Sequence, residues 1–339
     1  MAQFNIILAG CGSMANEWVR YTKSRSDASI AALVDISEEN AKALAEKHEM
    51  DVPIYRGITE ALDRTNANLV YDITIPKAHR EIVTKAMAQG CAVFGEKPMA
   101  ESLEDAKAMV EAAQNLEKHY SVMQNRRYLK QIRSLRELLA KDTLGPLGFV
   151  CADFFLGPHF GGFRDLMDSP LILDMAIHTF DQARFITGAD PVSVYCHEFN
   201  PSGSWYKGNA AAACIFEMSD GSVFCYRGSW CAEGFPTSWE SEWRITGSKG
   251  TALWDGASLP TCEVVVPSDE QGFNSELEQI PGNDTWDGRE GHYGCLDEMF
   301  AALAEGRKAE TDCADNIKSM AMVFGAIQSA REGKKIALI

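Results

Sequence analysis

The sequence predicts a two-domain α/β protein, in which a doubly wound parallel sheet is followed by an α+β domain with a largely antiparallel, open sheet. Its length of 339 residues exceeds the usual span of one hydrophobic core. Hydrophobic residues make up 46% and charged residues 24%, the balance of an ordinary globular protein. The chain changes character near residue 122, so we expect one domain over residues 1–122 and a second over 123–339.

The first half alternates short apolar runs with amphipathic stretches. Strands are predicted at residues 4–9, 30–34, 69–73, 92–94 and 120–123. Helices are predicted from residue 15 onwards and at residues 38–48, 79–89 and 103–117. Strands that alternate with helices imply βαβ units and a parallel sheet.

The second half contains strand-like runs separated by turn residues such as Ser219-Asp220-Gly221. This pattern favours a largely antiparallel sheet. Strands are predicted at residues 192–199, 210–218, 222–230, 240–247 and 263–266. Helices precede these strands at 129–140 and 172–187, and close the chain at 292–305 and 314–332.

Charge and cysteine spacing exclude several classes of function. The chain has 32 Lys and Arg against 48 Asp and Glu, a net charge of −16, which repels phosphate backbones and anionic lipid headgroups. We therefore expect neither nucleic acid nor membrane as a partner. No apolar run approaches the ~20 residues that span a bilayer, and the N-terminus has no basic leader. None of the ten cysteines forms a CxxC pair, so we expect no metal site, and reduced thiols in the cytoplasm.

The strongest local motif is Gly10-x-Gly12-x-x-Ala15, which follows a predicted strand and precedes a predicted helix. Gly10 permits a tight turn, Gly12 lets the backbone approach a pyrophosphate, and Ala15 keeps the helix close to the sheet. Asp35 ends the second strand, 20 residues past Ala15, where a dinucleotide fingerprint has its acidic ribose ligand. A carboxylate there accepts hydrogen bonds from the ribose hydroxyls and repels a 2′-phosphate, so NAD is favoured over NADP. The alternative is a strand-end aspartate that merely faces solvent.

Three further stretches complete a recognisable set: Thr-Ile-Pro-Lys-Ala-His at 74–79, Gly-Glu-Lys-Pro at 95–98 and Asp-Met-Ala-Ile-His-Thr-Phe-Asp at 174–181. Together with the glycine motif and Asp35, they resemble the Gfo/Idh/MocA family of glucose–fructose oxidoreductases, inositol dehydrogenases and their relatives. The resemblance covers nearly the whole chain, including Gln-Asn-Arg-Arg-Tyr at 124–128. The chain departs from the family at 169–173, Ser-Pro-Leu-Ile-Leu, where many members have glycines. The resemblance therefore does not determine the pocket wall or the substrate.

The resemblance implies a set of site residues. We expect the cofactor to contact Gly10, Gly12, Ser13, Met14, Asp35, Thr74, Pro76, His79, Glu96 and Lys97. For His79, packing inside its helix is an equal alternative. The expected catalytic residues are Lys97, Asp174 and His178. The candidate substrate contacts are Lys97, Arg127, Tyr128, Arg164, Asp174 and His178, with Arg164 in a Gly- and Phe-rich stretch that suits a mobile pocket wall.

These residue types suit the oxidation of a secondary alcohol, which needs a hydride acceptor and a proton acceptor. Asp174 and His178 are four residues apart and would share one face of a helix. The histidine can take the hydroxyl proton while the carboxylate orients it. Lys97 can hydrogen-bond to the substrate oxygen or act as the base itself. We favour a relay in which Lys97 touches the oxygen and His178 completes the transfer.

We therefore expect a cytoplasmic NAD-dependent dehydrogenase that acts on a sugar, inositol or related polyol. One alternative is a glycoside-cleaving enzyme of the same fold that keeps NAD bound and oxidises a sugar carbon only transiently. Another is a non-catalytic NAD-sensing regulator, although Lys97 and His178 are both present. An open sheet face should be covered by another subunit, which predicts a homodimer or homotetramer. The tryptophans that either cover this face or pack inside the domain are Trp230, Trp239, Trp243 and Trp254.

Overall fold

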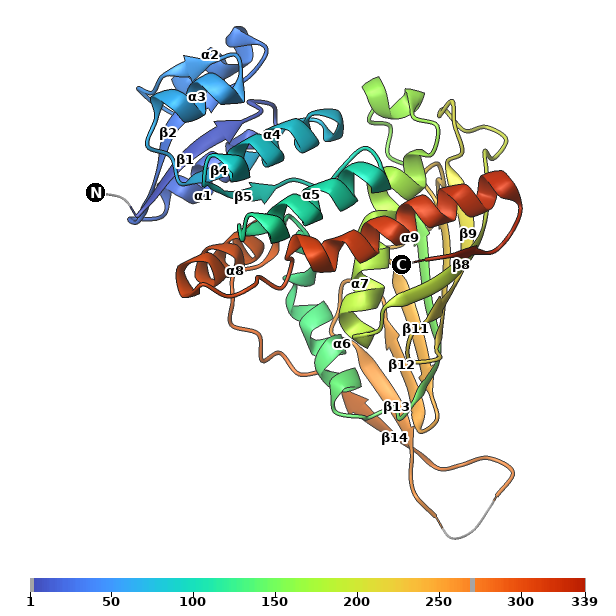
Figure 1. The fold of residues 1–339 in the computed structure, drawn as a ribbon. Helices are drawn as coiled ribbons and strands as arrows, with labels where there is room; N and C mark the ends of the chain where they lie inside the picture. Colours follow the sequence, from blue (N-terminus) through green and yellow to red (C-terminus); the bar gives the residue numbers. More distant parts are fainter. Residues whose placement is uncertain (1–2, 269–271, 339) are drawn as a thin grey trace. The chain divides into compact units, whose positions relative to one another are not determined.

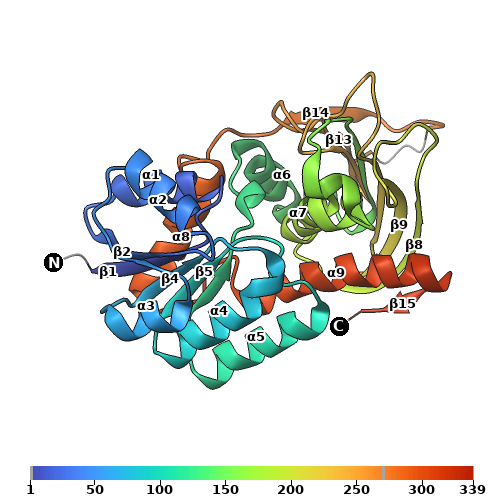
Figure 2. The same cartoon turned by 90° about the horizontal axis from the view of Figure 1, so that it is seen from above.

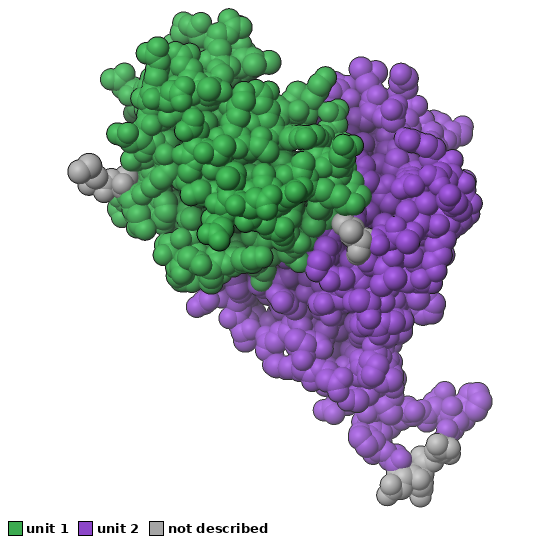
Figure 3. All heavy atoms as spheres, viewed as in Figure 1, with its two compact units in different colours: residues 1–124, 292–317 green, residues 125–291, 318–339 purple. Residues whose placement is uncertain are grey.

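The computed structural model describes residues 3–268 and 272–338. The chain divides into two compact units, drawn in green and purple in Figure 3. Unit 1 comprises residues 1–124 and 292–317, and unit 2 comprises residues 125–291 and 318–339. The sequence assigned all of 123–339 to the second domain, so the placement of 292–317 in unit 1 differs from that assignment.

Unit 1 contains a six-stranded sheet in the order β3-β2-β1-β4-β5-β6, and all of its strand pairs are parallel. This confirms the expected doubly wound sheet. Strand order reverses between β1 and β4, and ligands of such sheets bind outside the carboxyl ends of the strands at that point. The strands are β1 (Phe4–Ala9), β2 (Ala28–Val34), β3 (Ile54–Tyr55), β4 (Leu69–Asp72), β5 (Ala92–Gly95) and β6 (Tyr120–Val122).

Helices cover both faces of this sheet. Ser37 and Ser102 cap two of them, since their hydroxyls accept hydrogen bonds from the N–H groups of Asn40 (3.2 Å) and Asp105 (3.0 Å). Figure 2 shows α4 and α5 together on one side. The shortest helix of this sheet's unit, α3, and its shortest strand, β3, were not predicted because they are too short to show a period. The helices are α1 (Ala15–Lys23), α2 (Glu38–Lys47), α3 (Ile58–Arg64), α4 (Pro76–Ala88) and α5 (Leu103–Asn115).

A helix from late in the chain completes unit 1. Helix α8 (Gly291–Glu305) carries Phe300, which is 1% exposed. The Phe300 ring lies 5.0 Å from the ring of Phe4, 5.7 Å from that of Tyr21 and 5.1 Å from that of Phe94. Because these rings belong to the parallel sheet and to α1, the return of the chain closes the apolar layer on this face. That packing is why residues 292–317 belong to unit 1.

Unit 2 contains a nine-stranded sheet in the order β14-β13-β12-β11-β7-β10-β9-β8-β15. Only the β7–β10 pair is parallel, so the expected largely antiparallel sheet is confirmed. Strands β7, β12, β14 and β15 were not predicted. The strands are β7 (Leu147–Phe155), β8 (Pro191–Phe199), β9 (Ala211–Met218), β10 (Val223–Ser229), β11 (Glu242–Gly247), β12 (Gly250–Trp254), β13 (Thr261–Val265), β14 (Leu277–Pro281) and β15 (Ile336–Ala337).

One face of this sheet is covered by helices. Helices α6 (Lys130–Ala140) and α7 (Ile177–Thr187) lie on the same side of it (Figure 1). Phe180 of α7 packs edge-on against the rings of Phe216 and Tyr226, at 4.9 and 5.2 Å. The unit boundary falls within α9 (Cys313–Glu332), between residues 317 and 318. Within the described residues, no helix combines the length and the apolar character needed to cross a bilayer.

The other face of the sheet is open. Alternate residues of β7, β8, β9 and β12 point to it, and four large apolar side chains there are about half exposed: Phe149, Tyr195, Ile215 and Leu253. Neither expectation, that the tryptophans cover the open face or that they pack inside the domain, holds for all four of them. Trp230, Trp243 and Trp254 are buried inside unit 2, whereas Trp239 is 44% exposed in the loop between β10 and β11.

Candidate functional site

The turn between β1 and α1 has the geometry of a phosphate-binding loop. Gly10 has φ +93°, and a Cβ atom there would lie 2.5 Å from the carbonyl of Ile73, so only glycine fits. At Gly12 no described atom lies within 4 Å of an added Cβ, so the backbone is open on that side. Helix α1 begins at Ala15, and no side chain caps it. The N–H groups of Ala15, Asn16 and Glu17 donate to the carbonyls of Gly12, Ser13 and Met14 (3.2, 3.3 and 3.0 Å), so an anion such as a pyrophosphate would bind to the N–H groups of the turn that precedes them.

Asp35 follows β2 and is anchored at both carboxylate oxygens. Its Oδ2 accepts a hydrogen bond from the N–H of Cys11 (2.7 Å), and its Oδ1 accepts one from the N–H of Ser37 (2.8 Å). These bonds join the end of β2 to the glycine turn and to the start of α2. Since a carboxylate oxygen accepts more than one hydrogen bond, both oxygens can still bind ribose hydroxyls. Burial, with the charge of Asp35 second, raises the pKa of the Cys11 thiol to about 12, so it stays protonated.

A buried carboxylate accepts hydrogen bonds from the loop after β4 and so stabilises it. Asp72 is 0% exposed, and its Oδ1 accepts hydrogen bonds from the hydroxyl (2.5 Å) and the N–H (3.2 Å) of Thr74. Pro76 is the first residue of α4. His79 is 1% exposed, and its ring nitrogens lie 3.1 Å from the Thr74 carbonyl and 3.2 Å from the Met99 carbonyl. This burial favours the packing alternative for His79, and its contact with a cofactor stays a prediction.

Sequence reasoning missed Asp72. It closes an otherwise apolar strand, Leu-Val-Tyr-Asp, and a charged group at the carboxyl end of a buried strand was the available signal. Its Oδ1 also lies 3.9 Å from Nε2 of His79, so the two residues support the same loop.

Glu96 anchors the loop after β5. It is 9% exposed, and its carboxylate accepts hydrogen bonds from the indole N–H of Trp18 (2.9 Å) and the N–H of Lys97 (3.2 Å). The Glu96 N–H in turn donates to the carbonyl of Asp72 (2.9 Å). The peptide bond from Lys97 to Pro98 is cis. Glu96 therefore fixes the backbone that bears Lys97, and its own side chain is occupied by α1.

In unit 2, Asp174 and His178 lie where two types of helix join. The sequence predicts one α-helix over 172–187, but Leu171–Ala176 form a π-helix that continues into α7. Asp174 lies in the π-helix and His178 in the first turn of α7. π-helical turns occur frequently at functional sites. His178 is 5% exposed, and Asp174 Oδ2 accepts a hydrogen bond from Nε of Arg164 (2.7 Å).

A second arginine, Arg126, approaches the same cluster. Its guanidinium lies 3.4 Å from the carboxylate of Glu240, and it donates to the carbonyl of Trp239. Burial lowers the pKa of Arg126, and the charges of Glu240 and Asp174 oppose that shift. Of these two adjacent arginines, the sequence analysis names only Arg127 as a candidate substrate contact.

Arg127 and Tyr128 are interior residues of unit 2. Arg127 is 4% exposed and forms two hydrogen bonds of 2.6 Å with the carboxylate of Asp181. Asp181 also accepts a hydrogen bond from the hydroxyl of Ser319 (2.8 Å). Tyr128 is 2% exposed, with the guanidinium of Arg133 4.7 Å above its ring. Both side chains are therefore held by neighbours within unit 2, and the contact of Arg127 and Tyr128 with substrate stays a prediction.

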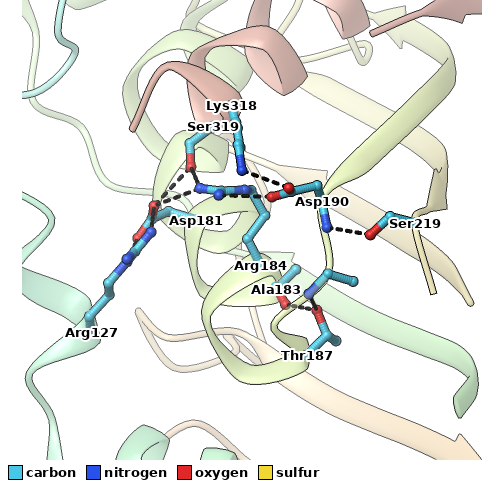
Figure 4. A network of polar contacts seen from close by, with 10 residues as sticks. Arg127, Asp181, Ala183, Arg184, Thr187, Asp190, Ser219, Lys318 and Ser319 are labelled. Carbon is cyan, nitrogen blue, oxygen red and sulfur yellow. Dashed lines mark hydrogen bonds and ion pairs between the residues drawn. The ribbon is translucent and has the colours of Figure 1, made fainter. Parts of the chain in front are cut away.

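The ion pair of Arg127 belongs to a larger network, shown in Figure 4. Arg184 donates to Ser319 (3.0 Å) and lies 3.2 Å from Asp190. Lys318 binds the other carboxylate oxygen of Asp190 at 2.6 Å. The network thus fastens α7 to the part of α9 that lies in unit 2. Among the described residues, no three His, Cys, Asp or Glu side chains are arranged to hold a metal ion.

Comparison with protein families matches both units. Residues 4–124 match an oxidoreductase family with an NAD-binding Rossmann fold, and residues 132–253 match the GFO/IDH/MocA C-terminal domain. A D-apiose dehydrogenase of Rhizobium rhizogenes is 27% identical over 354 aligned positions, covering 99% of this chain and 98% of that protein. An inositol 2-dehydrogenase of Ralstonia nicotianae is 30% identical over 187 aligned positions, or 54% of each chain.

Solved structures show the same fold. An oxidoreductase from Agrobacterium radiobacter, crystallised with NAD+, L-tartaric acid and magnesium, superposes with a TM-score of 0.86 at 23% identity. The superposition covers 99% of this chain and 98% of that one.

Proposed function

Because the chain belongs to the Gfo/Idh/MocA family of NAD-binding oxidoreductases that act on CH–OH groups, we propose that it oxidises a secondary hydroxyl of a sugar, inositol or related polyol. The observation that carries the proposal is the glycine turn anchored by Asp35, because it fits a dinucleotide. The named relatives act on polyhydroxylated compounds. The ten cysteines form no disulfide within the described residues, which suits the reducing cytoplasm.

The preferred cofactor in this proposal is NAD rather than NADP. Asp35 has the lone pairs to accept both hydroxyls of the adenosine ribose. Two more carboxylates, Glu38 and Glu39, stand in the first turn of α2 directly after it. This concentration of negative charge opposes a 2′-phosphate.

Proton handling is assigned to Lys97, Asp174 and His178. Bound NAD supplies the hydride acceptor. Lys97 donates a hydrogen bond to the reacting oxygen and stabilises negative charge as it develops there. His178 takes the proton, and the carboxylate of Asp174 stabilises the imidazolium that results. Arg164, already bound to Asp174, orients that carboxylate.

The proposed assembly is a homodimer or homotetramer. The open face of the nine-stranded sheet supports it, since Phe149, Tyr195, Ile215 and Leu253 leave apolar surface in contact with water. Exposed apolar patches on a sheet are typical of subunit contacts.

The deciding experiment measures NADH formation by the purified protein with inositols, aldoses and glycosides. We expect turnover with NAD that Lys97→Met and His178→Asn each lower by about 100-fold or more, the usual scale for acid–base groups. Lys107→Met is the matched control, because Lys107 is an exposed lysine of α5 in the same unit. Loss of activity in the control variant, or full activity in Lys97→Met, contradicts the assignment.

The same assay separates the two alternatives. A glycoside that disappears without net NADH indicates the enzyme that keeps its cofactor bound. NAD binding in a calorimeter without turnover of any compound indicates the regulator.

A further inference from the structure

Three loops of unit 2 meet at one edge of its sheet. β8 and β10 are both antiparallel to β9, and β10 is parallel to β7. The carboxyl ends of β7, β8 and β10 therefore lie together. The loops that follow them, residues 156–170, 200–210 and 230–241, emerge from this edge. The first of these loops leads directly into the π-helix that carries Asp174.

Aromatic rings from these loops contact one another. Phe160 (55% exposed) and Trp239 (44% exposed) have ring centroids 6.4 Å apart. Both contact Trp230, which is fully buried, at 5.9 and 5.5 Å. We call Phe160, Trp230 and Trp239 the aromatic rim. Two half-exposed rings thus lie against a buried tryptophan.

The aromatic rim adjoins the proposed catalytic group. The guanidinium of Arg164 lies 5.2 Å from the centroid of the Phe160 ring, and its Nε is 2.7 Å from Asp174. One side chain thus separates the rim from the carboxylate. Since Arg164 is already paired with Asp174, it offers no uncompensated charge to a phosphate or a carboxylate on a ligand.

We propose that the aromatic rim is a subsite for a second, uncharged ring of the substrate, so that the enzyme acts on glycosides in preference to free aldoses or inositols. This inference rests on the proposed dehydrogenase function. The C–H face of a pyranose, or an aryl aglycone, stacks on exposed aromatic rings and removes their apolar surface from water. A single polyol ring bound at Asp174 would leave Phe160 and Trp239 exposed.

A second copy of the chain is the competing occupant, and the position of the rim argues against it. The apolar residues proposed for assembly, such as Tyr195 and Ile215, lie on the open face of the sheet. The rim lies in loops beyond the strand ends, beside Arg164 and Asp174. Continuity with those two residues favours a part of the substrate.

The test compares p-nitrophenyl glucosides and galactosides, and cellobiose, with D-glucose, D-galactose and myo-inositol. We expect higher kcat/KM for the glycosides. Trp239→Ala and Phe160→Ala should each lower kcat/KM for the glycosides about tenfold by raising KM, the scale of one lost ring contact. The same variants should change kcat/KM for the free sugars by less than about twofold. Phe235→Ala is the matched control, because Phe235 lies in the same loop, fully exposed and outside the rim.

Binding of the same glycosides in a calorimeter gives a readout that does not depend on turnover. Weaker binding to Trp239→Ala than to Phe235→Ala supports the subsite, and equal binding overturns it. Equal losses on glycosides and free sugars also overturn it, as does a change in sedimentation with unchanged kinetics. If free aldoses are oxidised without any preference for glycosides, the subsite fails while the dehydrogenase function stands. If no compound is oxidised but glycosides bind through the rim, the proposed function fails instead.

Discussion

Asp35 has a structural role and, in the proposed function, a binding role as well. Its two oxygens hold the backbone at Cys11 and Ser37, and their remaining lone pairs are available to a ligand. The sequence motif predicts the ligand contact, and the structure adds the anchoring of the glycine turn. Substitutions at Asp35 therefore change both the affinity for cofactor and the rigidity of the loop.

Asp35→Asn should raise KM for NAD by about tenfold, because the charge-assisted hydrogen bonds to the ribose weaken. KM for NADP should fall, since the repulsion of its 2′-phosphate is reduced. Both constants are measured in parallel. The control is Asp51→Asn, an exposed aspartate between α2 and β3. An unchanged ratio of the two KM values would refute the role of Asp35 in cofactor choice.

Glu198 of β8 is an acid held partly in its neutral form. Its Oε2 accepts a hydrogen bond from the hydroxyl of Ser169 (3.0 Å), just before the π-helix. Burial raises the pKa of Glu198 to about 7, against the opposing effect of hydrogen bonds from Ser169 and Asn209. The folded protein therefore binds a proton at pH values where the unfolded chain has released it.

The free energy of unfolding should consequently fall as pH rises from about 4.5 to 7, because the folded state binds more protons in that window. Glu198→Gln removes this dependence. Between pH 5 and 8 the free energy of unfolding of the variant should fall by up to about 3 kcal/mol less than that of the parent. Urea unfolding at several pH values measures it, with Glu217→Gln as a control on the neighbouring strand. Parallel pH profiles for the parent and Glu198→Gln would contradict the shift.

At the scale of elements, ion pairs between side chains hold α7 in place, in addition to the contacts of its apolar residues. Its residues from Ile177 to Ile186 are all buried, so the charges of Asp181 and Arg184 must be compensated within unit 2. Arg127, Asp190 and Ser319 provide that compensation (Figure 4). The network sets the position of the helix whose first turn carries His178.

Arg127→Met should cost about 3–5 kcal/mol in urea unfolding, because it leaves the Asp181 carboxylate buried without its partner. The double variant Arg127→Met/Asp181→Leu should recover most of that loss. Lys130→Met is the control: Lys130 forms an exposed pair with Asp284 at 3.5 Å and should cost less than about 1 kcal/mol. A raised KM with unchanged stability in Arg127→Met would instead support a substrate contact.

For the whole molecule, the open sheet face is the surface proposed to control assembly. Ile215→Lys places a charge in the middle of that face and should give a monomer in sedimentation at micromolar concentration, while the parent is a dimer or tetramer. Burying an unpaired charge in a subunit contact is unfavourable by several kcal/mol. Leu259→Lys is the control, since Leu259 is 40% exposed but lies in a turn outside the strands. A monomeric parent protein would disprove the proposed assembly.

The sequence by itself determined the features that are local. Alternation of strands and helices predicted the parallel sheet, and the motif from Gly10 to Asp35 predicted a turn whose open backbone and anchored carboxylate the structure shows. Each of these signals lies within about 30 residues, and periodicity reports directly which face of an element is apolar.

Tertiary structure decided what those faces pack against. A pattern shows that α8 has an apolar side, but only the contacts of Phe300 show that it covers the parallel sheet. The insertion of β7 between β10 and β11 joins strands about 70 to 100 residues apart, which no local period records. The pair of Arg127 with Asp181 joins residues 54 positions apart, which the run of two arginines does not indicate. These outcomes arise from non-local packing, where the identity of the partner sets the free energy.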